Sequence, residues 1–264
     1  MSMTDTDATN APATNAPAPD LTIVMPFYMN PGMLSIQYAK WAAWPEEIKD
    51  RIAIILVDDG SPVGHAIDVP RPECLPALSI YRVLEDRPWH QHAARNLGAY
   101  VAGEGWLLLT DMDHVLAEED AAALLKRIGL GKLDTGTVYM LNRIEADTGL
   151  QTLQNGFAKP HPNSFVLTRE AFWRIGGYDE DFCGVYGTDG LFRARAFANA
   201  KQGHLDKVSL TRYWRDLVED ASTTTLLRKD GRDPLAKHRI MEAKRTRGEQ
   251  DVVKVLQFPW ERVF

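Results

Sequence analysis

The sequence predicts an α/β fold in which helices flank a doubly wound, mostly parallel β-sheet. Short runs of apolar, β-branched residues alternate along the chain with longer amphipathic segments, as is typical of strand–helix–strand units. The run at 52–57, IAIILV, is apolar on both faces, as central strands of a parallel sheet are. Two of the apolar runs end abruptly in aspartates, at the strand ends where open α/β sheets bind ligands.

The individual elements follow from the same pattern. Apolar runs predict strands at 21–25, 52–57, 78–83, 106–109 and 137–142. Periodic apolar residues predict helices at about 33–50, 92–102, 118–128, 168–175 and 190–202. Pro26 stops the first strand and the Gly60-Ser61-Pro62 turn follows the second. Thr168 is the candidate cap of the fourth helix.

The chain divides into three parts. Residues 1–20 are mainly Ala, Pro, Thr, Asn and Asp, which predicts a disordered tail because little can be buried. Residues 21–218 carry the strand and helix pattern and predict a single domain, while residues 219–264 form a polar, basic C-terminal extension. With 264 residues, 45% of them hydrophobic, the chain is long enough to bury a sizeable core.

Composition also excludes some classes of protein. The net charge of −6 gives no indication of general nucleic-acid binding. The only two cysteines, Cys74 and Cys183, lack metal-ligand spacing, which favours a reduced, cytoplasmic setting. No apolar run approaches the length of about 18 residues that a membrane span needs, and no secretory signal is visible.

The most informative segment is Trp106-Leu-Leu-Leu-Thr-Asp-Met-Asp113. In an extended chain, residues two apart point the same way, so Asp111 and Asp113 can converge on one cation at the strand end. Carboxylate oxygens suit Mg²⁺ or Mn²⁺, which stay partly hydrated and bridge to substrate phosphates. The alternative is a strand followed by a polar turn or helix cap, where Asp is common.

A second acidic pair, Asp58-Asp59, follows the strand at 52–57. A carboxylate after an early strand often binds a ribose or a base, although a turn closed by Asp side chains is the alternative. No Gly-x-Gly-x-x-Gly fingerprint or P-loop follows any strand, which argues against dinucleotide oxidoreductases and P-loop nucleoside triphosphatases.

Four blocks together resemble family 2-type glycosyltransferases of the GT-A fold. They are Ile23-Val-Met-Pro-Phe-Tyr28, Val57-Asp-Asp-Gly-Ser61, Ala94-Arg-Asn-Leu-Gly98, and Asp111-Met-Asp113, which resembles the family's Asp-x-Asp motif. The resemblance implies that Pro26 and Phe27 lie on the nucleotide base and that Asp58 or Asp59 binds uracil or ribose. It also places Arg95 under the nucleotide.

A fifth block, Gly176-Gly-Tyr-Asp-Glu-Asp-Phe182, resembles the acceptor-side segment of these enzymes and of galactosyltransferases. In those families it leads to a Gly-Glu-Asp segment whose Asp is the catalytic base. Here the corresponding piece is Gly187-Thr188-Asp189, so Asp189 takes the place of the base and Thr188 replaces the Glu. The alternative role for Asp189 is an N-cap of the following helix.

The resemblance implies a metal-dependent, inverting glycosyltransferase whose donor is a nucleotide-sugar, most simply a UDP-sugar. Asp111 and Asp113 bind Mn²⁺ or Mg²⁺ in this interpretation, and Asp111 also contacts the donor. Many relatives supply a later His as a further ligand. The nearest histidine here is His204, which is therefore the candidate third ligand, and His161 is a candidate beside the donor diphosphate.

The acceptor stays open between a glycan, a lipid-linked sugar and a hydroxylated nucleic-acid base. Basic residues at 226–247 indicate either a solvated helix or a site for an anionic acceptor. The polar segment 220–225 is a candidate lid that orders when the donor binds. Two rival functions remain. One is a sugar-phosphate nucleotidyltransferase, which would need a Gly-rich loop after the first strand, and the other is a catalytically silent nucleotide-sugar-binding module.

Overall fold

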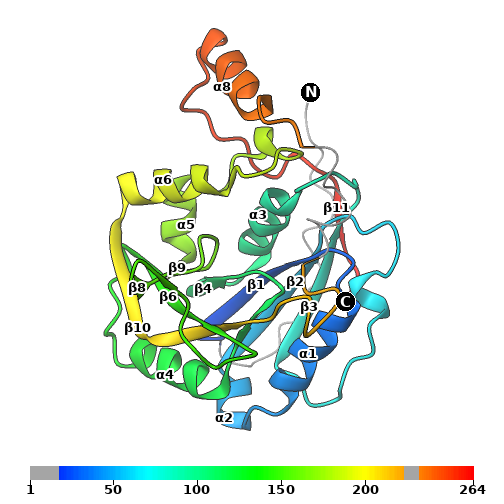
Figure 1. The fold of residues 1–264 in the computed structure, drawn as a ribbon, viewed down its shortest axis with the longest axis vertical. Helices are drawn as coiled ribbons and strands as arrows, with labels where there is room; N and C mark the ends of the chain where they lie inside the picture. Colours follow the sequence, from blue (N-terminus) through cyan, green and yellow to red (C-terminus); the bar gives the residue numbers. More distant parts are fainter. Residues whose placement is uncertain (1–17, 223–231) are drawn as a thin grey trace.

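The computed structural model describes residues 18–222 and 232–264 and confirms the predicted α/β fold with a single domain (Figure 1). Nine strands form one sheet in the order β11-β3-β2-β1-β4-β9-β6-β10-β5. The four strands β3, β2, β1 and β4 are parallel neighbours. Strands β11, β9 and β5 run antiparallel to their partners, so the sheet is mixed outside its parallel part.

The strands of the sheet have the following bounds: β1 Leu21–Phe27, β2 Ile52–Asp58, β3 Ala77–Val83, β4 Trp106–Leu109, β5 His114–Leu116, β6 Thr137–Glu145, β9 Phe165–Thr168, β10 Lys201–Arg212 and β11 Trp260–Arg262. A separate hairpin consists of β7 Leu153–Gln154 and β8 Phe157–Ala158. All five predicted strands are present. Strands β5, β9, β10 and β11 had not been predicted.

The helices have these bounds: α1 Pro31–Ala42, α2 Glu46–Lys49, α3 Gln91–Val101, α4 Glu118–Gly129, α5 Arg169–Ile175, α6 Asp189–Asn199 and α8 Ala236–Thr246. Two 3-10 turns are η1 Ala66–Asp68 and η2 Glu180–Phe182. The helix expected over 33–50 is split in two at Pro45, because proline disfavours helical geometry in the residue before it. Thr168 caps α5 as predicted, accepting a hydrogen bond from the Ala171 amide at 3.1 Å.

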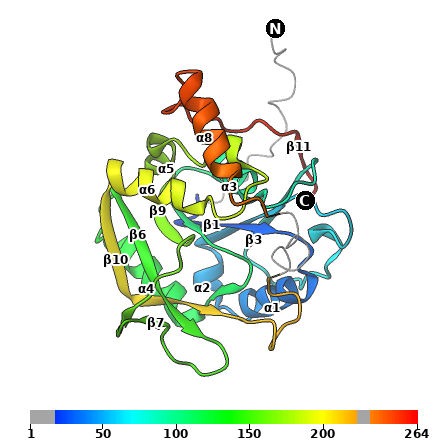
Figure 2. The same ribbon diagram turned by 45° about the horizontal axis from the view of Figure 1, so that its top comes forward.

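The core forms two layers, one on each face of the sheet. Helices α1, α2 and α4 cover one face, and α3, α5 and α6 cover the other (Figures 1 and 2). Strand β1 serves both layers because alternate side chains point to opposite faces. Ile23 and Met25 pack in the first layer, whereas Val24 packs in the second. This arrangement holds β1 between β2 and β4, so the carboxyl ends of all three strands meet at one edge.

The ends of the chain differ from the sequence expectation. Residues 1–17 lie outside the described part, but Asp20, assigned to the tail, is joined to Arg51 by an ion pair of 2.6 Å and by backbone hydrogen bonding. The C-terminal extension is part of the fold, because β11 pairs with β3 and completes that edge of the sheet. Among the described residues, no helix is both long and apolar enough to cross a membrane.

Helix α3 packs closely on β1 at Gly98. A Cβ atom added there would lie 2.2 Å from Val24 Cγ1. We expect Gly98→Ala to lower the free energy of unfolding by about 1–3 kcal/mol, because overpacking forces a backbone shift. Denaturant unfolding would measure this change. Gly103→Ala is the matched control, since its added Cβ would meet nothing within 4 Å. Equal stability of the two variants would contradict the close packing of α3 on β1.

Candidate active site

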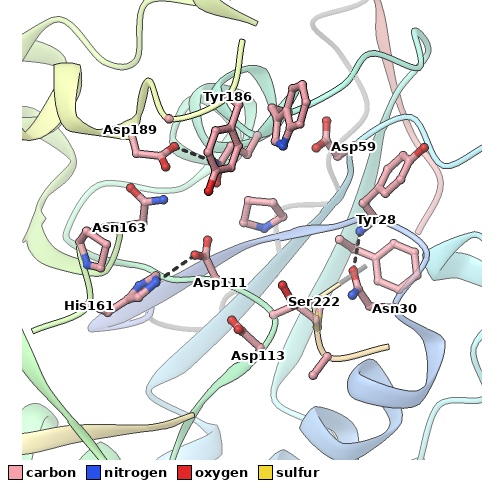
Figure 3. Close-up of a pocket in the computed structure, with 18 of the residues that line it drawn as sticks. Tyr28, Asn30, Asp59, Asp111, Asp113, His161, Asn163, Tyr186, Asp189 and Ser222 are labelled. Carbon is pink, nitrogen blue, oxygen red and sulfur yellow. Dashed lines mark hydrogen bonds and ion pairs between the residues drawn. The ribbon is translucent and has the colours of Figure 1, made fainter. Parts of the chain in front are cut away.

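A cavity of about 300 Å³ lies at the edge where β1, β2 and β4 end (Figure 3). Seven residues singled out from the sequence line it: Pro26, Phe27, Asp59, Asp111, Asp113, His161 and Asp189. They come from segments far apart in the chain, which the parallel strands bring to one edge. Three other predicted site residues, Asp58, Arg95 and His204, do not line this cavity.

Asp111 and Asp113 follow β4, whose leucines are fully buried. The sequence predicts an extended chain at this point. In the structure the chain turns instead, and the His114 amide donates to the Asp111 carbonyl at 3.1 Å. Both carboxylates still reach the cavity, with side chains 26% and 21% exposed. The turn, and not the alternation of side chains along a strand, therefore brings both carboxylates to the cavity.

Arg95 lies beneath Asp111. Its side chain is 0% exposed and forms an ion pair and hydrogen bond with Asp111 Oδ1. Within the described part of the chain, Arg95 Nε and Nη1 have no hydrogen-bond partner. Burial raises the pKa of Asp111, while the charge of Arg95 acts in the opposite direction. Arg95 is thus a buried counter-charge that orients Asp111. It lies outside the cavity lining, and a contact between Arg95 and the donor stays a prediction.

Two histidines stand beside the acidic pair. The His114 Nδ1 atom is 2.7 Å from Asp113 Oδ1, and His161 Nε2 is 3.4 Å from Asp111 Oδ2. The two imidazole rings have centroids 3.9 Å apart. Burial, followed by the charges of His114 and Arg95, holds the pKa of His161 well below its usual value. His161 is therefore neutral near pH 7, and it adds no positive charge beside Asp111.

The acidic pair fits a magnesium or manganese ion of the type that binds with its substrate. In the described ranges, no three His, Cys, Asp or Glu side chains converge as they would around an ion held by protein alone. Mg²⁺ commonly takes only one or two carboxylates and completes its shell with water and substrate phosphates. Asp111 and Asp113 supply two hard oxygen ligands on a cavity wall, which matches that pattern.

His204 is not available as a third ligand, so this prediction is corrected. It lies exposed on β10, opposite Met140 of β6, and lines a different cavity together with Lys126 and Tyr139. The sequence expectation took His204 because it is the histidine nearest to where relatives supply a later ligand. In the structure His204 lies on β10, which follows α6 directly, and it is not among the residues that line the cavity with Asp113.

The pair Asp58-Asp59 is divided between two roles. The buried Asp58 carboxylate accepts hydrogen bonds from the amides of Ser61 at 2.8 Å and Ala66 at 3.0 Å. Burial raises the pKa of Asp58, although these hydrogen bonds oppose the shift. Asp58 thus shapes the loop, and the prediction that it binds donor is corrected. Its neighbour Asp59 lines the cavity, because consecutive side chains point to opposite sides.

Asp189 is the first residue of α6, and its carboxylate enters the cavity from the wall opposite the acidic turn (Figure 3). Gln91 Nε2 donates to Asp189 Oδ1 at 2.5 Å, and His92 Nε2 lies 3.8 Å from the same oxygen. Burial alone would raise the pKa of Asp189. The neighbouring His92 and Asn163 side chains and the charge of Arg95 outweigh it, so the pKa is lowered and the carboxylate is ionised near neutral pH.

The sequence had not pointed to Gln91 or Asn163 as site residues. Both line the cavity. The signal for Gln91 is its place four residues before Arg95, because side chains at this spacing share one face of a helix. Both then face the acids at the carboxyl ends of the strands. Nothing in the local pattern indicates Asn163, since it lies in an irregular loop between β8 and β9.

Residues 220–222 cover another part of the cavity. Asp220 accepts hydrogen bonds from the amides of Gly32 at 2.6 Å and Met33 at 2.8 Å, so it caps the start of α1. The next residues, Ala221 and Ser222, line the cavity. The candidate lid at 220–225 therefore begins on the site, and its remainder, 223–225, lies outside the described residues. Whether it closes on the donor stays a prediction.

Most of the positive charge in the part of the C-terminal extension that the structure describes is paired locally. Ion pairs join Arg239 to Asp233, Arg245 to Glu242 at 2.6 Å, and Arg247 to Glu249 at 2.8 Å. Lys244 is buried against acidic residues of η2 and the residue before it. Arg228 and Lys229 lie outside the described residues. The extension thus offers less free charge for an anionic acceptor than its composition indicated, and that acceptor site stays a prediction.

Solved structures with the same arrangement of elements identify the fold. No family model and no curated protein matches the chain. TarS 1–349 from S. aureus, a GT-A-type glycosyltransferase, matches with a TM-score of 0.57 over 89% of this chain and 75% of that one, at 17% identity. The chain has a glycosyltransferase fold.

Two further TarS structures agree with this. One is TarS 1–349 in complex with UDP-GlcNAc, with a TM-score of 0.57 and 15% identity over 89% of this chain and 76% of that one. The other is S. aureus TarS, with a TM-score of 0.58 and 14% identity over 88% of this chain and 44% of that one. At such identities the likeness establishes the fold. Membership of family 2 stays a prediction.

Proposed function

We propose that this protein is an inverting glycosyltransferase that transfers a sugar from a UDP-sugar to an acceptor hydroxyl with the help of Mg²⁺ or Mn²⁺. The observation that carries the proposal is the meeting of three carboxylates at one cavity: Asp111 and Asp113 on one wall and Asp189 on the other. TarS, whose fold is similar, has been solved with UDP-GlcNAc, which supports a nucleotide-sugar as donor.

Each wall of the cavity has a distinct task in this proposal. Pro26 and Phe27 at the end of β1 and Asp59 after β2 form the side for the nucleotide. Asp111 and Asp113 would hold the ion, which when bound neutralises charge developing on the diphosphate leaving group. Buried Arg95 holds Asp111 in place from beneath, so the acidic turn is oriented before the donor arrives.

Asp189 is assigned as the general base. A sugar hydroxyl is a weak nucleophile, so its proton must be removed by a positioned group as it attacks. The lowered pKa of Asp189 keeps its carboxylate ionised, and the Gln91 hydrogen bond fixes one oxygen. Attack on the anomeric carbon from the face opposite the diphosphate inverts its configuration in a single displacement.

The rival functions fit the site less well. A sugar-phosphate nucleotidyltransferase would need a Gly-rich loop after β1, where Pro26-Phe27-Tyr28 stands instead. A silent binding module does not require a carboxylate at Asp189 facing the acidic turn. The hydrogen bonds and buried charges that orient these acids favour an enzyme.

Turnover of donor tests the proposal. The protein is incubated with UDP-GlcNAc, UDP-glucose or UDP-GalNAc and Mn²⁺, with and without a hydroxyl acceptor, and released UDP is measured. We expect release from one donor, its loss with EDTA, and a product with the β configuration from the α-linked donor by proton NMR. A product of retained configuration, or release unaffected by EDTA, would contradict the proposed mechanism.

A further inference from the structure

The C-terminal extension is anchored to the segment that precedes the proposed base. Lys244 of α8 is buried, with its side chain 3% exposed. Its ammonium group donates to Asp179 Oδ2 at 2.8 Å, to Asp181 Oδ2 at 2.9 Å and to the Val252 carbonyl at 2.7 Å. An ammonium group has three donors, and here all three are used. A buried charge paired in this way resists separation, because breaking it leaves ions without water or partners.

The chain beyond α8 adds further bonds to the same segment. The carboxylate of Glu180 accepts hydrogen bonds from the amides of Leu256 at 2.8 Å and Gln257 at 2.7 Å, and the Glu180 amide donates to the Lys254 carbonyl at 2.8 Å. Asn96 of α3 donates to the same carboxylate at 2.8 Å. The extension is thus bonded to η2, and η2 to α3. We call residues 236–257 the C-terminal clamp.

One side chain connects this anchored segment to the base. His92 is buried in the first turn of α3, where its Nδ1 lies 3.3 Å from the Asp179 carbonyl. Its other nitrogen, Nε2, lies 3.5 Å from Thr188 Oγ1 and 3.8 Å from Asp189 Oδ1. The ring also packs on Tyr178, with centroids 5.2 Å apart. Contacts therefore run from Lys244 through Asp179 and His92 to Asp189.

The loop before Asp189 contains two glycines in the left-handed region. Gly184 and Gly187 have φ angles of +93° and +74°, and an added Cβ at either would meet nothing within 4 Å. Glycine loses the most conformational freedom when it is ordered, so contacts from outside the loop add to internal ones such as the Thr188 hydroxyl bond to the Val185 carbonyl at 3.0 Å. Gln91 and His92 supply those contacts to Asp189, and both stand on the helix turn that faces η2.

We propose that the C-terminal clamp positions Asp189 for catalysis, acting through Lys244, Asp179 and the positioning residue His92. The proposal rests on the proposed function, because it gives the clamp a role in proton removal from the acceptor. It assigns the extension to organising the base, and it explains why a lysine is buried far from the donor cavity. Thr188, which stands where the resemblance expects a Glu, has its hydroxyl 3.5 Å from His92 Nε2.

The first test compares Lys244→Met with Arg245→Met. Both remove one positive charge from neighbouring positions of α8, but Arg245 is exposed and bonded only to Glu242 in the described structure. Hydrogen exchange measured by mass spectrometry on peptides covering residues 183–192 reports the order of the base segment without needing activity. We expect faster exchange there in Lys244→Met and no change in Arg245→Met. Unchanged exchange in Lys244→Met would overturn the clamp whatever the enzyme's activity.

Kinetics test the catalytic consequence. In Lys244→Met we expect kcat to fall by about 10- to 100-fold, the scale for a displacement of about 1 Å at a reacting group. The Kd for UDP should stay within about 2-fold of the unaltered protein, because the nucleotide wall is untouched. If the protein without any substitution shows no turnover, the proposed function is contradicted. If that protein is active and both methionine variants have the same kcat, only the clamp is contradicted.

His92→Phe and His92→Asn separate positioning from packing. The His92 ring, whose Nε2 lies 3.8 Å from Asp189 Oδ1, lowers the pKa of Asp189, so we expect the acid limb of kcat/KM to move to higher pH in His92→Phe and partly back in His92→Asn. The titratable groups that face Asp189 are His92, Arg95, Asp111 and Tyr178. The double variant with Lys244→Met should lose less than the product of the single losses, since both act on one carboxylate. The pathway through His92 is overturned if the acid limb of kcat/KM does not move and the loss in the double variant equals the product of the losses in the two single variants.

Discussion

Asp189→Asn is expected to lower kcat for glycosyl transfer by about 10²- to 10⁴-fold, the usual contribution of a positioned general base. The substitution preserves size, and the asparagine carbonyl still accepts the Gln91 hydrogen bond that the carboxylate accepts now. What it removes is the basic oxygen that takes the acceptor proton. The fall should appear in kcat measured by UDP release, while the Kd for UDP from calorimetry stays nearly unchanged.

Asp206→Asn is the matched control, because its side chain is 71% exposed on β10 and lies outside the cavity. It should retain the full rate. If Asp189→Asn also kept its rate, Asp189 would have no part in proton removal. Its alternative role from the sequence, the N-cap of the helix, falls to Thr188 in the structure, and Asp189 is the first residue of α6. If Asp189→Asn lost nucleotide binding as well as its rate, Asp189 would be a donor contact and not the base.

Asp113→Ala is expected to abolish the Mn²⁺-dependent thermal stabilisation by a UDP-sugar. A ligand at 100 times its Kd stabilises the native state by about 2.7 kcal/mol, or about 5–10 °C for a chain of this size. Without Asp113, one of the two carboxylates proposed to bind the ion is lost. The donor diphosphate then loses the positive charge of the ion, which attracts it. Melting temperatures with UDP-GlcNAc, with and without Mn²⁺ or EDTA, measure the effect.

Asp113 is the better choice for this test than Asp111. Removing Asp111 would leave the buried guanidinium of Arg95 without its ion-pair partner, and an uncompensated buried charge destabilises the fold itself. Asp113 is bonded to the side chain of His114, and no ion pair joins it to a buried arginine among the described residues. Asp206→Ala should keep the full shift. A shift that persists in Asp113→Ala would exclude this carboxylate as a ligand.

Strands β1, β2 and β4 could be predicted because they are short apolar runs buried on both faces, and such runs are visible in sequence. Strand β10 could not, because its side chains alternate irregularly between exposed and buried and include Lys201, Asp206 and Lys207. Strand β11 has three exposed residues. Both strands form because a neighbouring strand, β6 for β10 and β3 for β11, offers backbone groups for hydrogen bonding. This is a property of the assembled sheet.

The site shows the same division at the level of single residues. Asp111, Asp113 and Asp189 were identified from motif and order, and the structure brings them to one cavity. Their partners were not identified, because His92 and Gln91 meet Asp189 only when α3 packs beside α6 across nearly a hundred residues of chain.

By itself, the sequence determined the α/β architecture and the acids that gather at its edge, since apolar runs must be buried and aspartates at the ends of parallel strands share that edge. Tertiary structure alone decided which acid of Asp58-Asp59 faces the cavity. It also decided that Arg95 lies beneath Asp111 and that His204 lines a different cavity. It also anchored the C-terminal extension through Lys244. The physical reason is that a side chain's direction and a buried charge's partner depend on packing between distant segments, which local sequence patterns do not encode.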